Sequence, residues 1–102
     1  MALDFAVLTE DETSADIVSL GMIEHDVLMT LAEQLGLTQL LRIEDYCEEI
    51  DFSFSELPKL AEDLSIVKNS ATSRELKEFA KQLDALITIA LKRKRQLTAV
   101  PD

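Results

Sequence analysis

Residues 72–95, TSRELKEFAKQLDALITIALKRKR, carry the clearest helical signal of this 102-residue chain. Apolar side chains recur every three or four positions, which places them on one face of a helix. That face comprises Leu76, Phe79, Ala80, Leu83, Leu86, Ile87, Ala90 and Leu91. Thr72 and Glu75 fit a capping box at its start. The bases Lys92–Arg95 lie at its end, where cations favour the helix dipole.

Two shorter helices are predicted in residues 24–49. The first spans residues 24–35, and Gly36 follows it as a residue that adopts positive φ easily. Its apolar face comprises Val27, Leu28, Leu31, Ala32 and Leu35. The second is expected to begin after an N-cap at Thr38 and to run to about Glu49. Its apolar face comprises Leu40, Ile43, Cys47 and Ile50.

A third upstream helix is predicted after the short extended link of residues 51–54. Ser53 with Glu56 fits a capping box, and Ser55 is an alternative N-cap. Pro58 is tolerated only near the start of a helix, which favours a start close to residue 55. The apolar face comprises Leu57, Leu60, Ala61, Leu64 and Val67.

The N-terminal residues alternate in hydropathy instead, as strands with one buried side do. Residues 3–8 and 16–22 show this pattern, and the polar segment 9–14 joins them as a turn. These runs predict a β-hairpin, with which residues 97–102 are expected to pair as an edge strand. The predicted fold is therefore α+β and helix-rich, an N-terminal β-hairpin packed against about four helices in a single domain of residues 1–102.

Charge is distributed unevenly along the chain. Residues 1–51 hold thirteen carboxylates and one base, Arg42, whereas residues 52–102 hold seven carboxylates and nine bases. The net charge of −10 therefore comes from the first half. A strongly acidic half repels nucleic acid and anionic membranes, and it attracts basic protein surfaces. We do not predict direct binding to nucleic acid or to a membrane. The run Lys92–Arg95 is the only feature of the sequence that favours contacts with phosphate groups.

The compartment follows from composition. One cysteine, Cys47, excludes an internal disulfide, and the apolar runs are too short to span a bilayer. The N-terminus lacks a basic region before an apolar block, which a secretory signal would have. We therefore expect a protein of the reducing cytoplasm.

Groups that carry catalysis are scarce. The chain has one His, one Cys and one Tyr, and its two glycines stand apart, so no phosphate-cradling loop is predicted. Cys47 lies on a predicted apolar helix face, where we expect it to pack in the core. His25, between Glu24 and Asp26, is expected at the surface or at its boundary. We predict no catalytic residue, metal site or cofactor, although a magnesium site of carboxylates alone stays open because acids are plentiful.

One stretch, residues 44–51 or EDYCEEID, places charge against the rules of helix electrostatics; we call it the acidic segment. Its acids stand four residues apart in two like-charged pairs, each of which destabilises a helix by about 0.2–0.5 kcal/mol. They also crowd the C-terminal end of the predicted second helix, where the dipole disfavours anions. A local rule broken without local gain is typical of a functional site.

We interpret the acidic segment as a partner-binding surface. The binding residues would be Glu44, Asp45, Tyr46, Glu48, Glu49 and Asp51, with Tyr46 as the aromatic anchor. The loop Glu10, Asp11 and Glu12 would widen the same surface. Two alternatives stay open. Either Lys92–Arg95 fold back and neutralise these acids inside the protein, or the acids are only solvated.

In size, acidity and poverty of catalytic residues, and in an acidic stretch that carries an aromatic, the chain resembles small bacterial immunity proteins of nuclease toxins. These include the immunity proteins of contact-dependent growth inhibition systems and colicins. The resemblance implies a cytoplasmic antitoxin whose acidic surface covers the basic active-site cleft of a cognate toxin and excludes substrate. The main rival is a regulatory or adaptor domain that binds a protein through helix packing. A nucleic-acid mimic comes third, and an enzyme last.

Overall fold

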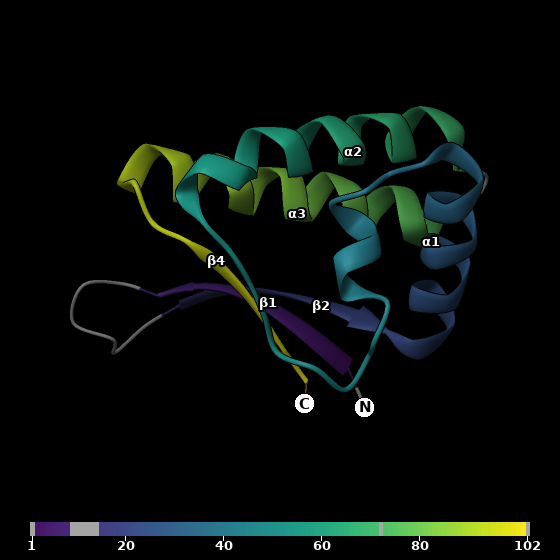
Figure 1. The fold of residues 1–102 in the computed structure, drawn as a ribbon, viewed down its shortest axis with the longest axis horizontal. Coiled ribbons are helices and arrows are strands. Elements are labelled where there is room, and N and C mark those ends of the chain that lie inside the picture. Colours follow the sequence, from purple (N-terminus) through teal and green to yellow (C-terminus); the bar gives the residue numbers. More distant parts are fainter. Residues whose placement is uncertain (1, 9–14, 72, 102) are drawn as a thin grey trace.

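The computed structural model describes residues 2–8, 15–71 and 73–101 (Figure 1). Four strands and three α-helices form in these residues, together with two single turns of 3₁₀ helix. In chain order they are β1 (Ala2–Leu8), β2 (Ala15–Gly21), α1 (Met22–Leu35), η1 (Leu40–Ile43), β3 (Ile50–Phe52), η2 (Phe54–Glu56), α2 (Leu57–Ser70), α3 (Arg74–Arg93) and β4 (Leu97–Pro101). None of the described helices is long and apolar enough to cross a membrane.

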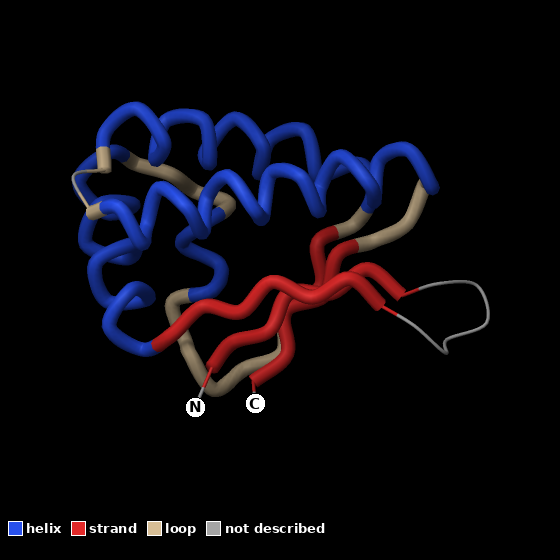
Figure 2. Tube along the Cα trace, turned by 180° about the vertical axis from the view of Figure 1, so that it is seen from behind, coloured by secondary structure: helices blue, strands red, loops and turns tan. Residues whose placement is uncertain are grey.

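The strands form one antiparallel sheet in the order β2-β1-β4-β3. The helices lie on one side of this sheet, as the two opposite views show (Figures 1 and 2). The predicted α+β class is confirmed. The predicted arrangement of an N-terminal hairpin packed against about four helices is not confirmed, because β1 and β2 pair as part of a larger sheet. Residues 97–101 do pair with β1, but as an inner strand between β1 and β3 and not at the edge.

The core fills the space between the sheet and the helices. Leu3, Phe5 and Val7 of β1 are fully buried, whereas the alternate residues Asp4 and Ala6 are partly exposed. This alternation confirms the predicted inward side of β1. The rings of Phe5 and Phe79 meet with their centroids 5.7 Å apart, which joins the sheet to α3.

α3 confirms the long helix predicted from its apolar stripe. Every residue of that stripe is buried except Leu91, which is partly buried against the core. The N-cap is Ser73, whose hydroxyl accepts a hydrogen bond from the N–H of Leu76, whereas Thr72 was the predicted cap and lies outside the described residues. The helix ends at Lys94, which adopts a positive φ of 56°.

Two other helix boundaries follow local signals. Gly36 ends α1 with a φ of 67°, as predicted. The capping box of Ser53 and Glu56 is confirmed, and Pro58 lies in the first turn of α2. The predicted inward face of α1 is partly wrong. The buried residues are His25, Leu28, Met29 and Ala32, while Val27 and Leu35 are 47% and 45% exposed.

The predicted helix of residues 38–49 is wrong. Only η1 forms there, and the chain then turns towards β3. Helical structure stops at Ile43, one residue before the first acid of the acidic segment, so the like-charged pairs never share a helix. The described residues therefore hold three α-helices and not about four.

Candidate protein-binding site

The acidic segment forms the connection between η1 and β3. Asp45 shapes its turn, because its Oδ1 accepts a hydrogen bond of 2.9 Å from the N–H of Cys47. Its carbonyl oxygen accepts another of 3.2 Å from the N–H of Glu48. Side chains of Asp that bond to the backbone two residues on favour turns over helix. The segment therefore holds a defined backbone without being helical.

Tyr46 anchors this connection to the corner between β2 and α1. Its hydroxyl donates a hydrogen bond of 2.9 Å to the carbonyl oxygen of Leu20. Its ring packs edge-on against the ring of His25, with centroids 4.7 Å apart. His25 Nε2 donates to the carbonyl oxygen of Ile43 at 2.7 Å. Tyr46, predicted as an interface anchor, is thus half-buried and has a structural role within the fold.

The prediction that His25 lies at the surface or boundary is wrong, because its side chain is only 5% exposed. The signal was present in the sequence. His25 stands three, four and seven residues before Leu28, Met29 and Ala32, which is the spacing of one helix face. A buried imidazole needs a hydrogen-bond partner, and the Ile43 carbonyl supplies it.

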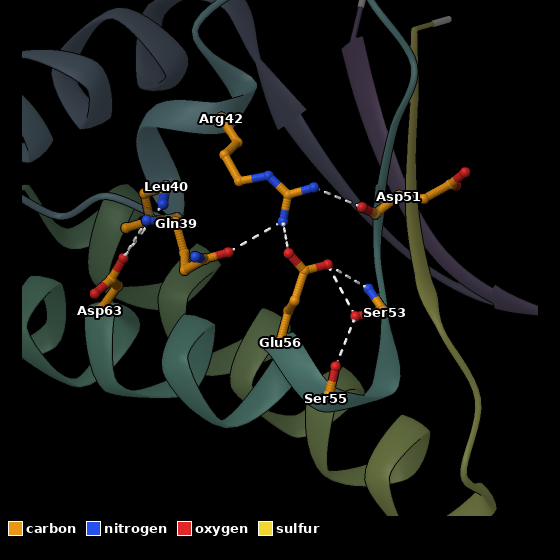
Figure 3. Close-up of polar contacts among 8 residues, drawn as sticks. All are labelled: Gln39, Leu40, Arg42, Asp51, Ser53, Ser55, Glu56 and Asp63. Carbon is orange, nitrogen blue, oxygen red and sulfur yellow. Dashed lines mark hydrogen bonds and ion pairs between the residues drawn. The ribbon is translucent and has the colours of Figure 1, made fainter.

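Arg42 fixes the other end of the segment (Figure 3). Its Nη1 donates to Gln39 Oε1 at 3.0 Å and to Glu56 Oε2 at 2.9 Å. Its Nη2 donates to the carbonyl oxygen of Asp51 at 2.8 Å, and the guanidinium lies 4.5 Å from the ring centroid of Phe52. In the sequence, Arg42 stands out only as the one base of residues 1–51, which does not indicate this role.

Two carboxylates of this region, Glu56 and Asp63, are also structural (Figure 3). Glu56 accepts hydrogen bonds from the backbone N–H and the hydroxyl of Ser53. These bonds, and then the nearby Arg42 guanidinium, hold the pKa of Glu56 below its ordinary value of 4.5. Asp63, buried on α2, accepts from the N–H groups of Gln39 and Leu40 at 2.9 and 3.3 Å. It therefore caps η1 from a distant element.

The acids of the segment point outwards. Glu44, Asp45, Glu48, Glu49 and Asp51 are all exposed. The ion pairs of the described residues are Arg42–Glu56, Lys59–Glu62 and Lys68–Asp84, and none of them involves these five acids. Asp51 accepts a hydrogen bond of 2.8 Å from the hydroxyl of Thr98, which is neutral. The structure thus exposes five carboxylates, none of which forms an ion pair within the described chain.

The topology separates this surface from Lys92–Arg95. β3 and β4 are antiparallel, with Phe52 opposite Leu97 and Ile50 opposite Ala99. Residues 44–49 therefore lie towards the Pro101 end of β4, whereas Lys92–Arg95 precede its Leu97 end. A five-residue strand is about 16 Å long. Neutralisation of residues 44–49 by that basic run therefore finds no support in the fold.

Two further predictions concern reactive and acidic groups. Cys47, predicted in the core, is exposed, because the helix face that would have buried it does not form. The loop Glu10, Asp11 and Glu12 lies outside the described residues. Within the described chain, no group of three or more His, Cys, Asp or Glu side chains is placed to hold a metal ion.

Comparison with known proteins gives no family. The chain matches no protein-family model, no curated protein and no solved structure. Its function must therefore be argued from its own surfaces, of which the acidic segment is one and two grooves are others.

The larger groove, of about 520 Å³, lies between β2 and α3 and is bordered by Glu24 of α1; we call it the β2–α3 groove. The smaller, of about 360 Å³, lies where α1 meets the junction of α2 and α3 and is lined by Val27, Leu31 and Ala71 among others; we call it the α1 groove. Ile23, which is 77% exposed, extends the apolar surface of α1.

Proposed function

We propose that this protein is an immunity protein that binds and neutralises a cognate toxin with a basic active-site cleft. The toxin we propose is a nuclease. The observation that carries the proposal is the acidic segment. It exposes five carboxylates that form no ion pair with any described residue. A surface of this kind is complementary to the lysines and arginines with which a nuclease holds its substrate.

The fixed backbone of the segment supports tight binding. Arg42 and Tyr46 tie its two ends to the body of the protein, and Asp45 closes its turn. The backbone is therefore ordered before the partner arrives, which lowers the entropy lost on association. Carboxylates presented in this way form charge-assisted hydrogen bonds with guanidinium and ammonium groups.

The proposal does not rest on strain stored in a helix. Residues 44–49 are not helical, so the dipole penalty expected from the sequence does not arise. It rests on exposure, on charge and on the lack of an internal counter-ion among the described residues.

The test is association with the candidate toxin, which a pull-down from the source organism or the product of the neighbouring gene would supply. We expect inhibition of its activity, and association that slows steeply between about 0.01 and 0.15 M salt, as the Debye length falls from about 30 to about 8 Å. The double variant Glu48→Gln/Glu49→Gln should associate more slowly. A matched control is Glu33→Gln/Glu62→Gln, which removes two exposed charges outside both the segment and the β2–α3 groove. A salt-independent rate would contradict the proposal.

A second candidate function, an adaptor that docks an apolar helix, is favoured by one observation. The α1 groove, which Val27 lines, and the exposed Ile23 one turn before it form an apolar surface along α1. Binding there would depend little on salt and would be lost in Val27→Asp, which leaves the acidic segment intact. The two functions are therefore separable in one titration series.

A further inference from the structure

The β2–α3 groove lies along an edge of the sheet. β2 is the outermost strand and pairs with β1 on one side only. α3 runs alongside β2, in the opposite direction, in both views of the molecule (Figures 1 and 2). The groove between them is bordered by Ser19–Gly21 on the strand and by residues 74–82 on the helix.

The chemistry of this groove is an apolar floor with an acidic rim. Leu20 and Phe79, both buried, form the floor. Glu24, Glu75 and Glu78 form the rim and outnumber its one base, Arg74. None of these three carboxylates forms an ion pair within the described residues. Their polar contacts are neutral, since Glu75 accepts from the Ser73 hydroxyl and Glu78 from the Gln82 amide.

The strand beside the groove is open to another strand. β2 has seven residues and no proline, so outward backbone groups of alternate residues have no strand partner in the described sheet. The opposite edge differs. Figure 3 shows Arg42 on the side of β3 away from β4, bonded to the carbonyl of Asp51. That edge is only three residues long, whereas β2 has seven residues, of which the Leu20 carbonyl accepts from Tyr46, so β2 is the longer edge available to a partner.

We propose that the β2–α3 groove binds an extended, basic segment of the partner protein. The segment adds to β2 as a further strand, and its alternate side chains enter the groove, where lysine or arginine meets Glu24, Glu75 and Glu78. This inference rests on the proposed function, because the occupant is taken from the basic partner. The hydroxyl of Tyr46 bonds to Leu20, so the acidic segment is tied to the strand that borders the groove.

The acidic rim of the groove and the length of its helical border favour a short basic strand as the occupant. A second copy of the chain would bring its own acidic rim to the same edge, and like charges repel. The helical border from residue 74 to residue 82 spans about 12 Å, which matches about four residues of extended chain. A short basic strand therefore fills the groove and leaves the acidic segment free to contact the rest of the partner.

The test uses a probe peptide with lysine at alternate positions, acetyl-Lys-Thr-Lys-Val-Lys-Thr-Lys-amide, titrated into ¹⁵N-labelled protein, with the same peptide carrying Glu for Lys as control. We expect chemical-shift changes and slowed amide exchange at Ser19–Gly21 and at residues 74–82 with the lysine peptide alone. Glu78→Lys should weaken its binding by at least about fivefold, and Glu24→Gln gives an independent second variant. Glu33→Lys makes the same charge change on α1 outside the groove and should weaken binding less than about twofold.

Each other outcome overturns the inference in a recognisable way. Shift changes confined to the acidic segment would remove the groove as the site and leave the proposed function standing. Concentration-dependent changes at β2 without peptide would identify a second copy as the occupant. No shift change at any residue would remove the groove, and binding of the toxin itself by the Glu48→Gln/Glu49→Gln variant would then decide the proposed function separately.

Discussion

Residues 38–49 and residues 74–93 both carry apolar side chains at helical spacing, yet only the second stretch is an α-helix. α3 has an N-cap at Ser73, an acid in its first turn and bases in its last, so every local preference agrees. The first stretch places its acids at what would be the helix end. The chain leaves the helical conformation at Ile43 and uses those residues as a connection to β3. Charge placement, and not apolar spacing, distinguishes the two.

What holds the two regions also differs. α3 is stabilised by its own cap and by burial of its stripe. The region of η1 and the acidic segment is held by contacts with other elements, namely the Asp63 carboxylate of α2 and the Leu20 carbonyl of β2, and by the bond from Arg42 to the Asp51 carbonyl. Variants that remove a distant contact should therefore unfold this region more than loss of a local cap affects α3.

The largest effect is expected for Asp63→Ala. It leaves the partly buried N–H of Gln39 and the buried N–H of Leu40 without their acceptor, which should cost about 3 kcal/mol. Asp63→Asn keeps one acceptor oxygen and should cost about 1 kcal/mol. Ser73→Ala, the local comparison in α3, should cost about 1 kcal/mol. Urea unfolding measures all three, and an Asp63→Ala loss no greater than that of Ser73→Ala would contradict the comparison.

Arg42→Ala should have the next largest effect and lower the free energy of unfolding by about 2 kcal/mol. The variant removes the hydrogen bond to the Asp51 carbonyl and the contact with the Phe52 ring. Lys59→Ala breaks an ion pair whose side chains are 57% and 69% exposed, and it should cost less than about 0.5 kcal/mol. Equal losses in the two variants would show that Arg42 is only another surface charge.

One substitution at the C-terminal end of α3 should stabilise the protein. Lys94 has a φ of 56°, which strains any residue with a Cβ, so Lys94→Gly should stabilise the protein by about 0.5 kcal/mol. Lys92→Gly removes the same charge from within the helix and should cost about 1 kcal/mol. Thermal unfolding of the two variants should therefore move in opposite directions. A shared direction would mean that charge, and not backbone strain, dominates there.

The double variant Glu48→Gln/Glu49→Gln should change the free energy of unfolding by less than about 0.5 kcal/mol, because both side chains are exposed in a turn. A helix ending at these residues would instead gain stability when the acids are neutralised. Chemical unfolding at low salt distinguishes the two cases. The same protein should bind a basic partner more weakly, which separates function from stability at these positions.

The smallest effect concerns pH and Glu56. Its folded-state pKa lies below 4.5, so its hydrogen bonds with Ser53 and its pair with Arg42 add stability above the unfolded pKa. That stability is lost as pH falls through the folded pKa. The stability difference between the wild type and Glu56→Gln should therefore be larger at about pH 7 than at about pH 3. Parallel stability curves for the two proteins would contradict this.

Sequence reasoning succeeded where the signal was local. The stripe of α3, the capping box of Ser53 and Glu56, and the positive φ of Gly36 each depend on residues a few positions apart. It failed where the cause was distant. Asp63 lies 24 residues from Gln39, and no pattern within residues 38–49 indicates the contact between them. The inner place of β4 likewise depends on β3, whose three residues are too few to show alternation.

The candidate site shows the same division. Exposure of the five acids is what charge alone would suggest, whereas the roles of Arg42, Tyr46 and His25 arise only when η1, β2 and α1 meet. The β2–α3 groove was missed because its two borders are more than fifty residues apart in the sequence. Its acids, Glu75 and Glu78, looked like ordinary features of the first turns of a helix.

The position of β4 sets the timing of assembly in the cell. β1 pairs with β4 through Leu3 and Pro101, so the middle of the sheet joins the two ends of the described chain. A ribosome adds roughly 5–20 residues per second, so the edge of β1 that pairs with β4 waits roughly 5–20 s for its partner, and the inward side of β1 waits almost as long for α3. During that interval Leu3, Phe5 and Val7 are open to chaperones and to other nascent chains. Newly made copies of this protein therefore keep an unpaired, apolar strand until synthesis reaches β4.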